Sequence, residues 1–273
     1  MPLRGWSNGA AMQLEVVEAA SFSKTGDETL NEDAYTIEAG LIAVFDGETN
    51  KGAPVIPSPG RRAALALAEA ARNLPRACDP ITIVKILQEA VAAVSGSDGS
   101  TAAVGAVLDV RSRRLTRVGD VTVGIDGEFH SRRKLLDEVA AVSRAALLRT
   151  HLLNGCTLDE LCAQDPGRQM ILPLLRAGFA WRNRAESDYG FPVLDGSATP
   201  ADMIEVFEIP AGAEVIVATD GYCDPRPTLR QSEEVLACSI AEDPLRLGPP
   251  PGTKAVLPDH VSFDDRTYVR VRL

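Results

Sequence analysis

The sequence is poor in the residues on which several common catalytic and metal centres depend. It has three histidines in 273 residues, and none lies in the motif of a serine hydrolase or a zinc protease. Its five cysteines contain no Cys-x-x-Cys pair and are odd in number, so neither a disulfide framework nor a structural zinc site is indicated. Chemistry based on histidine or thiolate ligands is therefore not expected.

Long hydrophobic runs and an excess of positive charge are also absent. The apolar stretches are short and broken by charged residues or glycine, so no transmembrane span is predicted. Residues 1–8 lack the apolar core and cleavage site typical of a signal peptide, so none is predicted and we expect a soluble cytoplasmic protein without a membrane partner. The formal net charge of −10 argues against a nucleic-acid partner, because phosphate backbones require clustered lysine and arginine. The short basic runs at 111–117 and 132–134 are interpreted as solvated turns and a helix face.

What the sequence does contain is a mixed pattern of strands and helices. A hydrophobic content of 45% is enough for a sizeable core, and one domain spanning residues 1–273 is predicted because the candidate site residues are spread along the chain. Strands are predicted at 13–23, 34–46 with a turn at 38–40, 100–110, 113–118, 121–125, 203–209, 214–219 and 267–273, and helices at 61–73, 80–95, across 132–180 and at 229–240. Because strands and helices do not alternate strictly, the pattern favours an α+β fold with antiparallel sheets.

Acidic residues lie at the ends of the apolar, strand-like runs. The clusters are Asn31-Glu32-Asp33, Asp46-Gly47 after a run of five apolar residues, Asp220-Gly221 with Asp224, and Asp264-Asp265 before the last strand. Mg²⁺ and Mn²⁺ prefer several oxygen ligands, which carboxylates gathered from distant strand ends can provide. The pattern therefore predicts metal-assisted chemistry.

The order of these clusters and the residue sequence of each one resemble the motifs of the metal-dependent Ser/Thr protein phosphatases of the PP2C or PPM family. The resemblance is to a divergent, bacterial-type member. Six motifs follow the order of that family: Asn31-Glu-Asp-Ala34, Val44-Phe-Asp-Gly47, Asp98-Gly-Ser-Thr-Ala102, Val118-Gly-Asp120, Ala218-Thr-Asp-Gly221 with Asp224, and Asp264-Asp-Arg-Thr267. The resemblance implies a PP2C-like αββα sandwich of two antiparallel sheets flanked by helices. It also implies a helical insertion, the flap, around residues 132–200, which we expect to set substrate choice.

The resemblance also implies a role for each acidic residue. Asp46 would bridge two metal ions with the Gly47 carbonyl as a further ligand, and Asp220 and Asp264 would complete the second metal site. Asp120 and Asp224, together with Asp220, would form a third, weaker site, and Glu32 and Asp33 would hold metal-bound waters. The alternatives are an ordinary Asp-Gly turn at 46–47, an exposed pair at 32–33 and a turn into a strand at Asp120.

The implied activity is hydrolysis of phosphoserine and phosphothreonine on proteins. The implied cofactors are two Mn²⁺ or Mg²⁺ ions, with a third at the weaker site. In the implied mechanism, a water that bridges two metal ions would attack phosphorus directly. Asp46, Glu32 and Asp33 would be the catalytic residues. The implied partner is a phosphoprotein, such as the product of a Ser/Thr kinase in a signalling pathway.

Two positions depart from the family pattern. Glu28 stands where the family often has an arginine that pairs with substrate phosphate, so phosphate recognition is predicted to come from Lys24 or Arg61, with Lys51 and Arg62 as alternatives. Glu48 and Thr49 stand where many members have a histidine that acts as general acid. A glutamate could take that role only if its pKa were raised.

These departures keep two other functions open. The first is a small-molecule phosphomonoesterase of the same fold, which Glu28 and the divergent insertion favour. The second is a catalytically weak metal-binding module whose segment 132–200 engages a partner.

Overall fold

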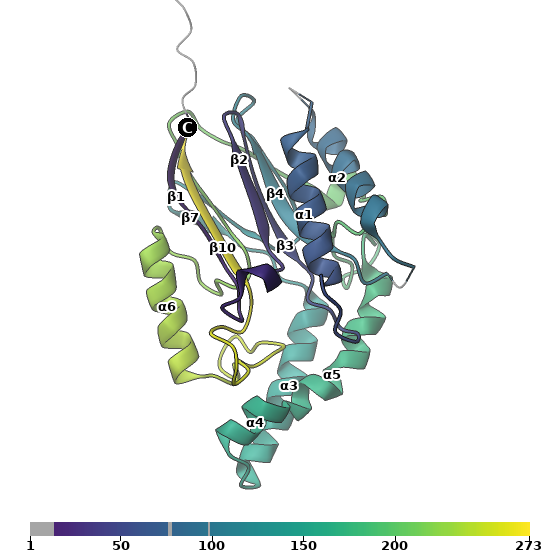
Figure 1. The fold of residues 1–273 in the computed structure, drawn as a ribbon, viewed down its shortest axis with the longest axis vertical. Coiled ribbons are helices and arrows are strands. Elements are labelled where there is room, and N and C mark those ends of the chain that lie inside the picture. The colour runs from purple at the N-terminus through teal and green to yellow at the C-terminus, as the bar shows by residue number, and fades with distance from the viewer. Residues whose placement is uncertain (1–13, 76–77, 98) are drawn as a thin grey trace, which may run out of the picture.

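Two antiparallel sheets of five strands each form the centre of the computed structural model, which describes residues 14–75, 78–97 and 99–273 (Figure 1). The first sheet has the order β1-β10-β9-β6-β7 and the second the order β2-β3-β4-β5-β8. The strands are β1 (Glu15–Phe22), β2 (Ala34–Glu38), β3 (Leu41–Gly47), β4 (Ala103–Asp109), β5 (Arg114–Val118), β6 (Thr122–Ile125), β7 (Glu128–His130), β8 (Glu205–Glu208), β9 (Glu214–Ala218) and β10 (Arg266–Arg272). The predicted motif residue Asp98 and the segment 1–8 lie outside the described residues.

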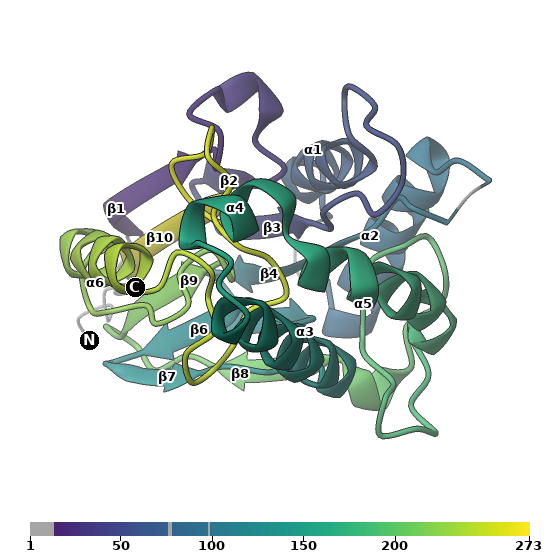
Figure 2. The ribbon, with the colours of Figure 1, turned by 90° about the horizontal axis from the view of Figure 1, so that it is seen from below.

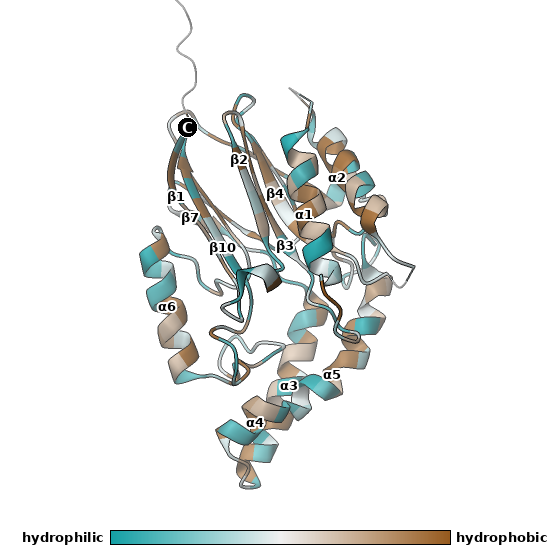
Figure 3. Ribbon diagram, viewed as in Figure 1, coloured by the Kyte–Doolittle hydropathy of each residue, from teal (hydrophilic) through white to brown (hydrophobic). Residues whose placement is uncertain are grey.

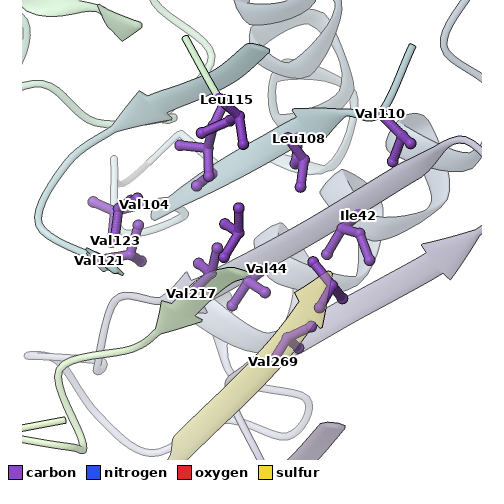
Figure 4. Close-up of a cluster of buried hydrophobic side chains, with 14 of the residues drawn as sticks. Ile42, Val44, Val104, Leu108, Val110, Leu115, Val121, Val123, Val217 and Val269 are labelled. Carbon is purple, nitrogen blue, oxygen red and sulfur yellow. The ribbon is translucent and has the colours of Figure 1, made fainter. Parts of the chain in front are cut away.

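The main hydrophobic core lies between the two sheets. Successive side chains of a strand point to opposite faces, and β3 shows this directly. Ile42 and Val44 face the other sheet, where they pack with Val217 and Val269 (Figure 4). The intervening Ala43 and Phe45 belong to a second core beneath the helices. The apolar run before Asp46 is therefore buried on both faces, which fixes the end of β3 in space.

Helices cover the outer face of each sheet. Helices α1 (Pro59–Arg72) and α2 (Pro80–Val94) lie on the second sheet, and α6 (Leu229–Glu242) lies on the first (Figure 1). Ser58 and Asp79 cap the first two by accepting hydrogen bonds from backbone amides of the first turn. Helix α1 carries both hydrophobic and hydrophilic residues (Figure 3), as expected of a helix that buries one face.

The segment between β7 and β8 forms the helical insertion. It contains α3 (Leu135–Leu153), α4 (Leu158–Gln164), α5 (Pro166–Ala177) and the short 3₁₀ helices η2 (Gly178–Trp181) and η3 (Ala201–Met203), while η1 (Glu28–Leu30) follows β1. Figures 1 and 2 show α3, α4 and α5 at one end of the sandwich, beyond the strand ends. The predicted α+β sandwich with a helical insertion at 132–200 is confirmed.

Small differences separate the predicted elements from the observed ones. Most boundaries shift by a few residues, and the three-residue strand β7 was not predicted because so short a run has no measurable periodicity. In the part of the chain that the structure describes, none of the helices combines the length and the apolar character needed to cross a lipid bilayer.

Candidate active site

Four of the predicted metal-binding aspartates line one pocket at the insertion end of the sandwich. Asp46 ends β3, Asp120 lies between β5 and β6, Asp220 follows β9 and Asp264 precedes β10. Strands β9 and β10 are antiparallel neighbours, so the end of one strand meets the start of the other. The four side chains share a cavity of about 110 Å³. Residues that are up to 218 positions apart in sequence are thus brought together by sheet topology.

The end of β3, next to Asp46, is held by a close approach of two glycines. The Gly47 amide donates to the Glu32 carbonyl at 3.1 Å. A Cβ atom on Gly47 would lie 2.4 Å from that carbonyl oxygen and 2.5 Å from the Gly60 carbonyl oxygen. Only a residue without a side chain fits here, so the end of β3 can pack directly on the first turn of α1.

Asp46 and Asp220 lack protein partners for their carboxylates. Among the described residues, neither side chain has a hydrogen bond or an ion pair. Burial, followed by the nearby carboxylates of Asp220 and Asp33, raises the pKa of Asp46 well above its usual range. The surrounding protein and then the carboxylates of Asp264 and Asp120 raise the pKa of Asp220 to about 6, although water reaches this side chain. The ammonium groups of Lys254 and Lys134 act to lower the pKa of Asp220 but do not outweigh these contributions, so net negative charge remains around these two residues.

The other two pocket aspartates are neutralised by lysines. Lys134 Nζ lies 3.2 Å from Asp120 Oδ2. Lys254 Nζ pairs with Asp264 Oδ2, and Lys24 Nζ lies 3.4 Å from Asp264 Oδ1. Burial alone would raise the pKa of Asp264, but the ammonium groups of Lys254 and Lys24 lower it to about 2. Asp264 is therefore charged at every physiological pH.

Glu32 and Asp33 lie beneath the pocket in a buried polar network. Glu32 accepts a hydrogen bond from Ser58 Oγ at 2.6 Å and pairs with Lys24 at 2.6 Å. Asp33 Oδ2 accepts hydrogen bonds from the hydroxyls of Thr219 and Thr267, each at 2.8 Å. Burial raises the pKa of Asp33 well above its usual range. The structure buries both residues, so the alternative of an exposed pair at 32–33 is wrong; their catalytic role stays a prediction.

Other predicted site residues are not free in the pocket. Asp224 is exposed, pairs with Arg226 and lines a separate groove beside α6. Of the two predicted phosphate ligands, Lys24 contacts three carboxylates, those of Glu32, Asp264 and Asp265. Arg61 donates to the Asn31 carbonyl, outside the residues that line the pocket. The metal role of Asp224 and the phosphate roles of Lys24 and Arg61 stay predictions without a supporting contact.

The two departures from the family pattern have different structural roles. The exposed Glu28 accepts hydrogen bonds from the Ser23 amide and from Asn31 Nδ2, and it does not line the pocket. Glu48 lines the pocket and pairs with Lys51 and Arg182. Burial acts to raise the pKa of Glu48, but Lys51 and Arg182 outweigh it and lower the pKa to about 2. Glu48 is therefore a carboxylate near neutral pH and has no proton to donate.

Several pocket residues were not predicted from the sequence. Lys134, Lys254 and Arg168 line the cavity together with the aspartates. The interpretation of 132–134 as a solvated helix face is wrong for Lys134, whose side chain is 20% exposed and paired with Asp120. Lysine is scarce in the chain, with five lysines among 28 basic residues. That scarcity is a pattern in the sequence that could have drawn attention to the individual lysines.

The donor set at Asp46 and Asp220 fits a hard divalent cation. Mg²⁺ is commonly bound through one or two carboxylates and otherwise keeps its waters. Two carboxylates without a hydrogen bond or an ion pair among the described residues, which line the same pocket, meet that requirement. Across the described ranges, no three His, Cys, Asp or Glu side chains converge as a ready metal site.

Comparison with known proteins supports the fold. Neither a family model nor a curated protein sequence matches the chain. Among solved structures, the chain is similar to the serine/threonine phosphatase PstP/Ppp of Mycobacterium tuberculosis, with 19% identity, a TM-score of 0.51, and coverage of 96% of this chain and 99% of that chain. This match identifies the class of fold as that of the PP2C or PPM phosphatases, and at this identity it shows the fold alone.

Two further matches have lower structural similarity. They are the catalytic domain of PstP in complex with two manganese ions, at 20% identity and a TM-score of 0.47 over 95% of this chain and 98% of that chain, and RsbX in complex with magnesium, at 15% identity and a TM-score of 0.44 over 95% and 99%.

Proposed function

We propose that the chain is a Mn²⁺- or Mg²⁺-dependent cytoplasmic phosphatase that hydrolyses phosphoserine or phosphothreonine on a protein. The observation that carries this proposal is the pair of carboxylates without a hydrogen bond or ion pair among the described residues, Asp46 and Asp220, which line one pocket in a PPM-type fold. A buried or crowded carboxylate without a counter-charge costs free energy. A bound divalent cation would remove that cost, and metal binding would therefore account for two carboxylates without an ion pair at this place.

The chain's own residues would hold the ion and position the phosphate. Asp46 and Asp220 would be the charged ligands, and the hydrogen bonds from Thr219 and Thr267 to Asp33 would keep the strand ends beneath them in place. When bound, the ion would supply Lewis acidity and lower the pKa of a nearby water. Leu136, Leu175 and Phe179 of the insertion line the outer wall of the pocket and would limit the access of bulk water.

The state of Glu48 bears on the choice of substrate. Because Glu48 is ionised and held by two cations, it cannot protonate the departing alkoxide of a serine or threonine ester. Esters with good leaving groups, which depart without protonation, should therefore react faster than phosphopeptides. A slow phosphopeptide activity is the expected outcome.

The proposal is tested by assaying the chain with Mn²⁺, with Mg²⁺ and with EDTA. We expect hydrolysis of an activated aryl phosphate and of phosphopeptides with either metal, and no hydrolysis in EDTA. Ion binding without turnover on any ester would contradict the proposal and favour the metal-binding module that engages a partner.

Arg168 is the residue best placed to bind substrate phosphate. It lines the pocket and donates to the Thr253 carbonyl at 3.2 Å. Within the described residues it makes no ion pair, whereas Lys51, Lys134 and Lys254 in the same pocket each pair with a carboxylate. The planar guanidinium group can bind two phosphate oxygens at once. Arg168 would take the place of the arginine that Glu28 replaces.

Replacing Arg168 by methionine should weaken phosphate binding with a smaller effect on kcat. One charge-assisted hydrogen-bonding group contributes about 1.5–3 kcal/mol, so KM for an aryl phosphate and Ki for inorganic phosphate should each rise about 10-fold to 100-fold. Arg184→Met is the matched control, since Arg184 is exposed and belongs to the same insertion. Unchanged Ki values in Arg168→Met would exclude this role.

A small-molecule phosphomonoesterase is the second candidate. The pocket has a volume of about 110 Å³ and is walled by side chains of the insertion, which suits a small ester better than a folded protein surface. A kcat/KM for metabolite phosphates well above that for phosphopeptides would favour this function.

A further inference from the structure

Nearly all lysines of the chain gather at the acidic site. Of the five lysines in the sequence, four pair with carboxylates in or beneath the pocket, namely Lys24, Lys51, Lys134 and Lys254. The fifth, Lys85, is exposed on α2. A lysine ammonium is a compact, strongly hydrated point charge, unlike the planar, delocalised guanidinium of arginine. Among side chains it is the closest equivalent of a metal cation.

Both oxygens of Asp264 are already engaged by ammonium groups. Oδ2 pairs with Lys254, and Oδ1 lies 3.4 Å from Lys24 Nζ while it accepts a hydrogen bond from the Asp265 amide at 3.1 Å. A divalent ion on this carboxylate would lie beside two positive charges and would have to displace one of them. Asp264 is thus a poor metal ligand in this arrangement, although the resemblance assigns it that role.

Lys254 is held in place by the loop that carries it. Its ammonium group donates to Thr49 Oγ1 at 3.0 Å. The backbone carbonyls of Leu245 and Gly252 in the same loop each accept a hydrogen bond of 2.9 Å from the fully buried Arg144. Because two points of the loop are fixed to α3, the backbone that carries Lys254 is held close to Asp264, with which its side chain pairs.

Asp120 is engaged in the same way. Lys134, which immediately precedes α3, places its ammonium group 3.2 Å from Asp120 Oδ2 and 5.4 Å from the centre of the Phe191 ring. The side chain is 20% exposed, so the ion pair is partly shielded from water and from salt. The aspartate assigned to the third metal site therefore has a protein cation beside it.

We propose that Lys254 and Lys134 are tethered cations that take the place of metal ions at Asp264 and Asp120, so that the site binds a single divalent ion, at Asp46 and Asp220. This inference rests on the proposed function only in taking that ion to be Mn²⁺ or Mg²⁺. It changes the expected stoichiometry from two or three ions to one.

The test is the number of Mn²⁺ ions bound by the EDTA-treated chain, measured by equilibrium dialysis at physiological ionic strength. We expect one ion per chain. Lys254→Met should bind a second ion at least about tenfold more tightly than the natural chain does, and Lys134→Met should do the same at Asp120. Lys254→Arg should keep the stoichiometry of one because it keeps the positive charge, and Lys85→Met is the control that should equal the natural chain. Thermal melts in EDTA check that each variant is folded.

Two results would overturn the inference. One is a natural chain that binds two or more ions with affinities within tenfold of each other, or none at all. The other is a folded Lys254→Met and a folded Lys134→Met that both bind the same number of ions as the natural chain. The two proposals can fail separately. One bound ion without turnover would support this inference and contradict the phosphatase function. Two bound ions with turnover would support the phosphatase function and contradict this inference.

Discussion

Replacing Asp46 by asparagine should remove phosphatase activity while it makes the metal-free chain more stable. Asparagine has nearly the same shape but lacks the charge, so an ion bound in the pocket would lose a carboxylate ligand. Changes to the partners of metal ligands already cost 10-fold to 100-fold in metal affinity or activity, so loss of the ligand itself should lower kcat/KM by at least about 100-fold. The assay is hydrolysis of an aryl phosphate at saturating Mn²⁺.

The gain in stability follows from the pKa of Asp46. Burial, the Asp220 and Asp33 carboxylates and further carboxylates nearby raise that pKa in the folded chain, so the folded state disfavours the charged form. As pH rises from the usual aspartate pKa through the folded pKa of Asp46, the natural metal-free chain loses stability. The Asp46→Asn variant has no titrating group at this position and does not lose that stability. The variant should therefore be more stable by about 0.5–2 kcal/mol at neutral pH, and the difference should disappear in acid, where Asp46 is protonated.

Urea denaturation in EDTA at neutral and acidic pH measures this difference. Asp188→Asn is a suitable control because Asp188 is an exposed carboxylate outside the pocket. A variant that is inactive but less stable than the natural chain would show that Asp46 has a structural rather than a metal-binding purpose.

The second large effect is expected at Arg144, which joins the insertion to the loop before β10. Its guanidinium group is fully buried. It donates to Asp165 from Nε at 2.9 Å and from Nη2 at 2.7 Å, and its Nη1 donates to the carbonyls of Leu245 and Gly252. Arg144→Met would leave Asp165, which is 7% exposed, as an unpaired charge. Removing one partner of a buried ion pair costs about 3–5 kcal/mol, and the free energy of unfolding should fall by that amount.

Two further variants make this prediction specific. Arg149 lies on the same helix and donates to the Leu247 carbonyl at 2.9 Å, but it is exposed, so Arg149→Met should cost less than about 1 kcal/mol. Asp165 also caps α5 by accepting from the Arg168 amide, and asparagine can keep that cap. Adding Asp165→Asn to Arg144→Met should therefore recover part of the loss. Equal costs for Arg144→Met and Arg149→Met in urea denaturation would disprove the role given to the buried pair.

The Arg144 network also explains how the insertion reaches the site. Helix α3 supplies Lys134 at its start and, through Arg144, fixes the loop that carries Lys254. Helix α5 begins at the residue after Asp165 and carries Arg168 in its first turn. The insertion thus contributes cations to a pocket whose carboxylates come from the sandwich. It is better described as part of the site than as a cover over it.

Much of the fold was predictable from local pattern. The run at 41–45 followed by Asp46-Gly47 predicted a buried strand with a carboxylate at its end, and β3 has this form. The apolar spacing at 80–95 predicted α2 almost to the residue. Such predictions succeed because a strand buried on both faces, or a helix buried on one, needs a periodic apolar pattern regardless of what it packs against.

The chemistry of the site was also predictable only in part. The sequence by itself determined that the carboxylates lie next to strands, because each one follows or precedes a strand-like run, and the sheet topology then brings them together. Only the tertiary structure decided which of them form an ion pair and which do not. Lys134, Lys254 and Lys51 reach the pocket on long side chains from the insertion and from loops, and Arg182 pairs with the pocket residue Glu48. The direction of such side chains depends on how α3, α5 and the loop before β10 pack together through the buried Arg144, and no local pattern in the sequence carries that information.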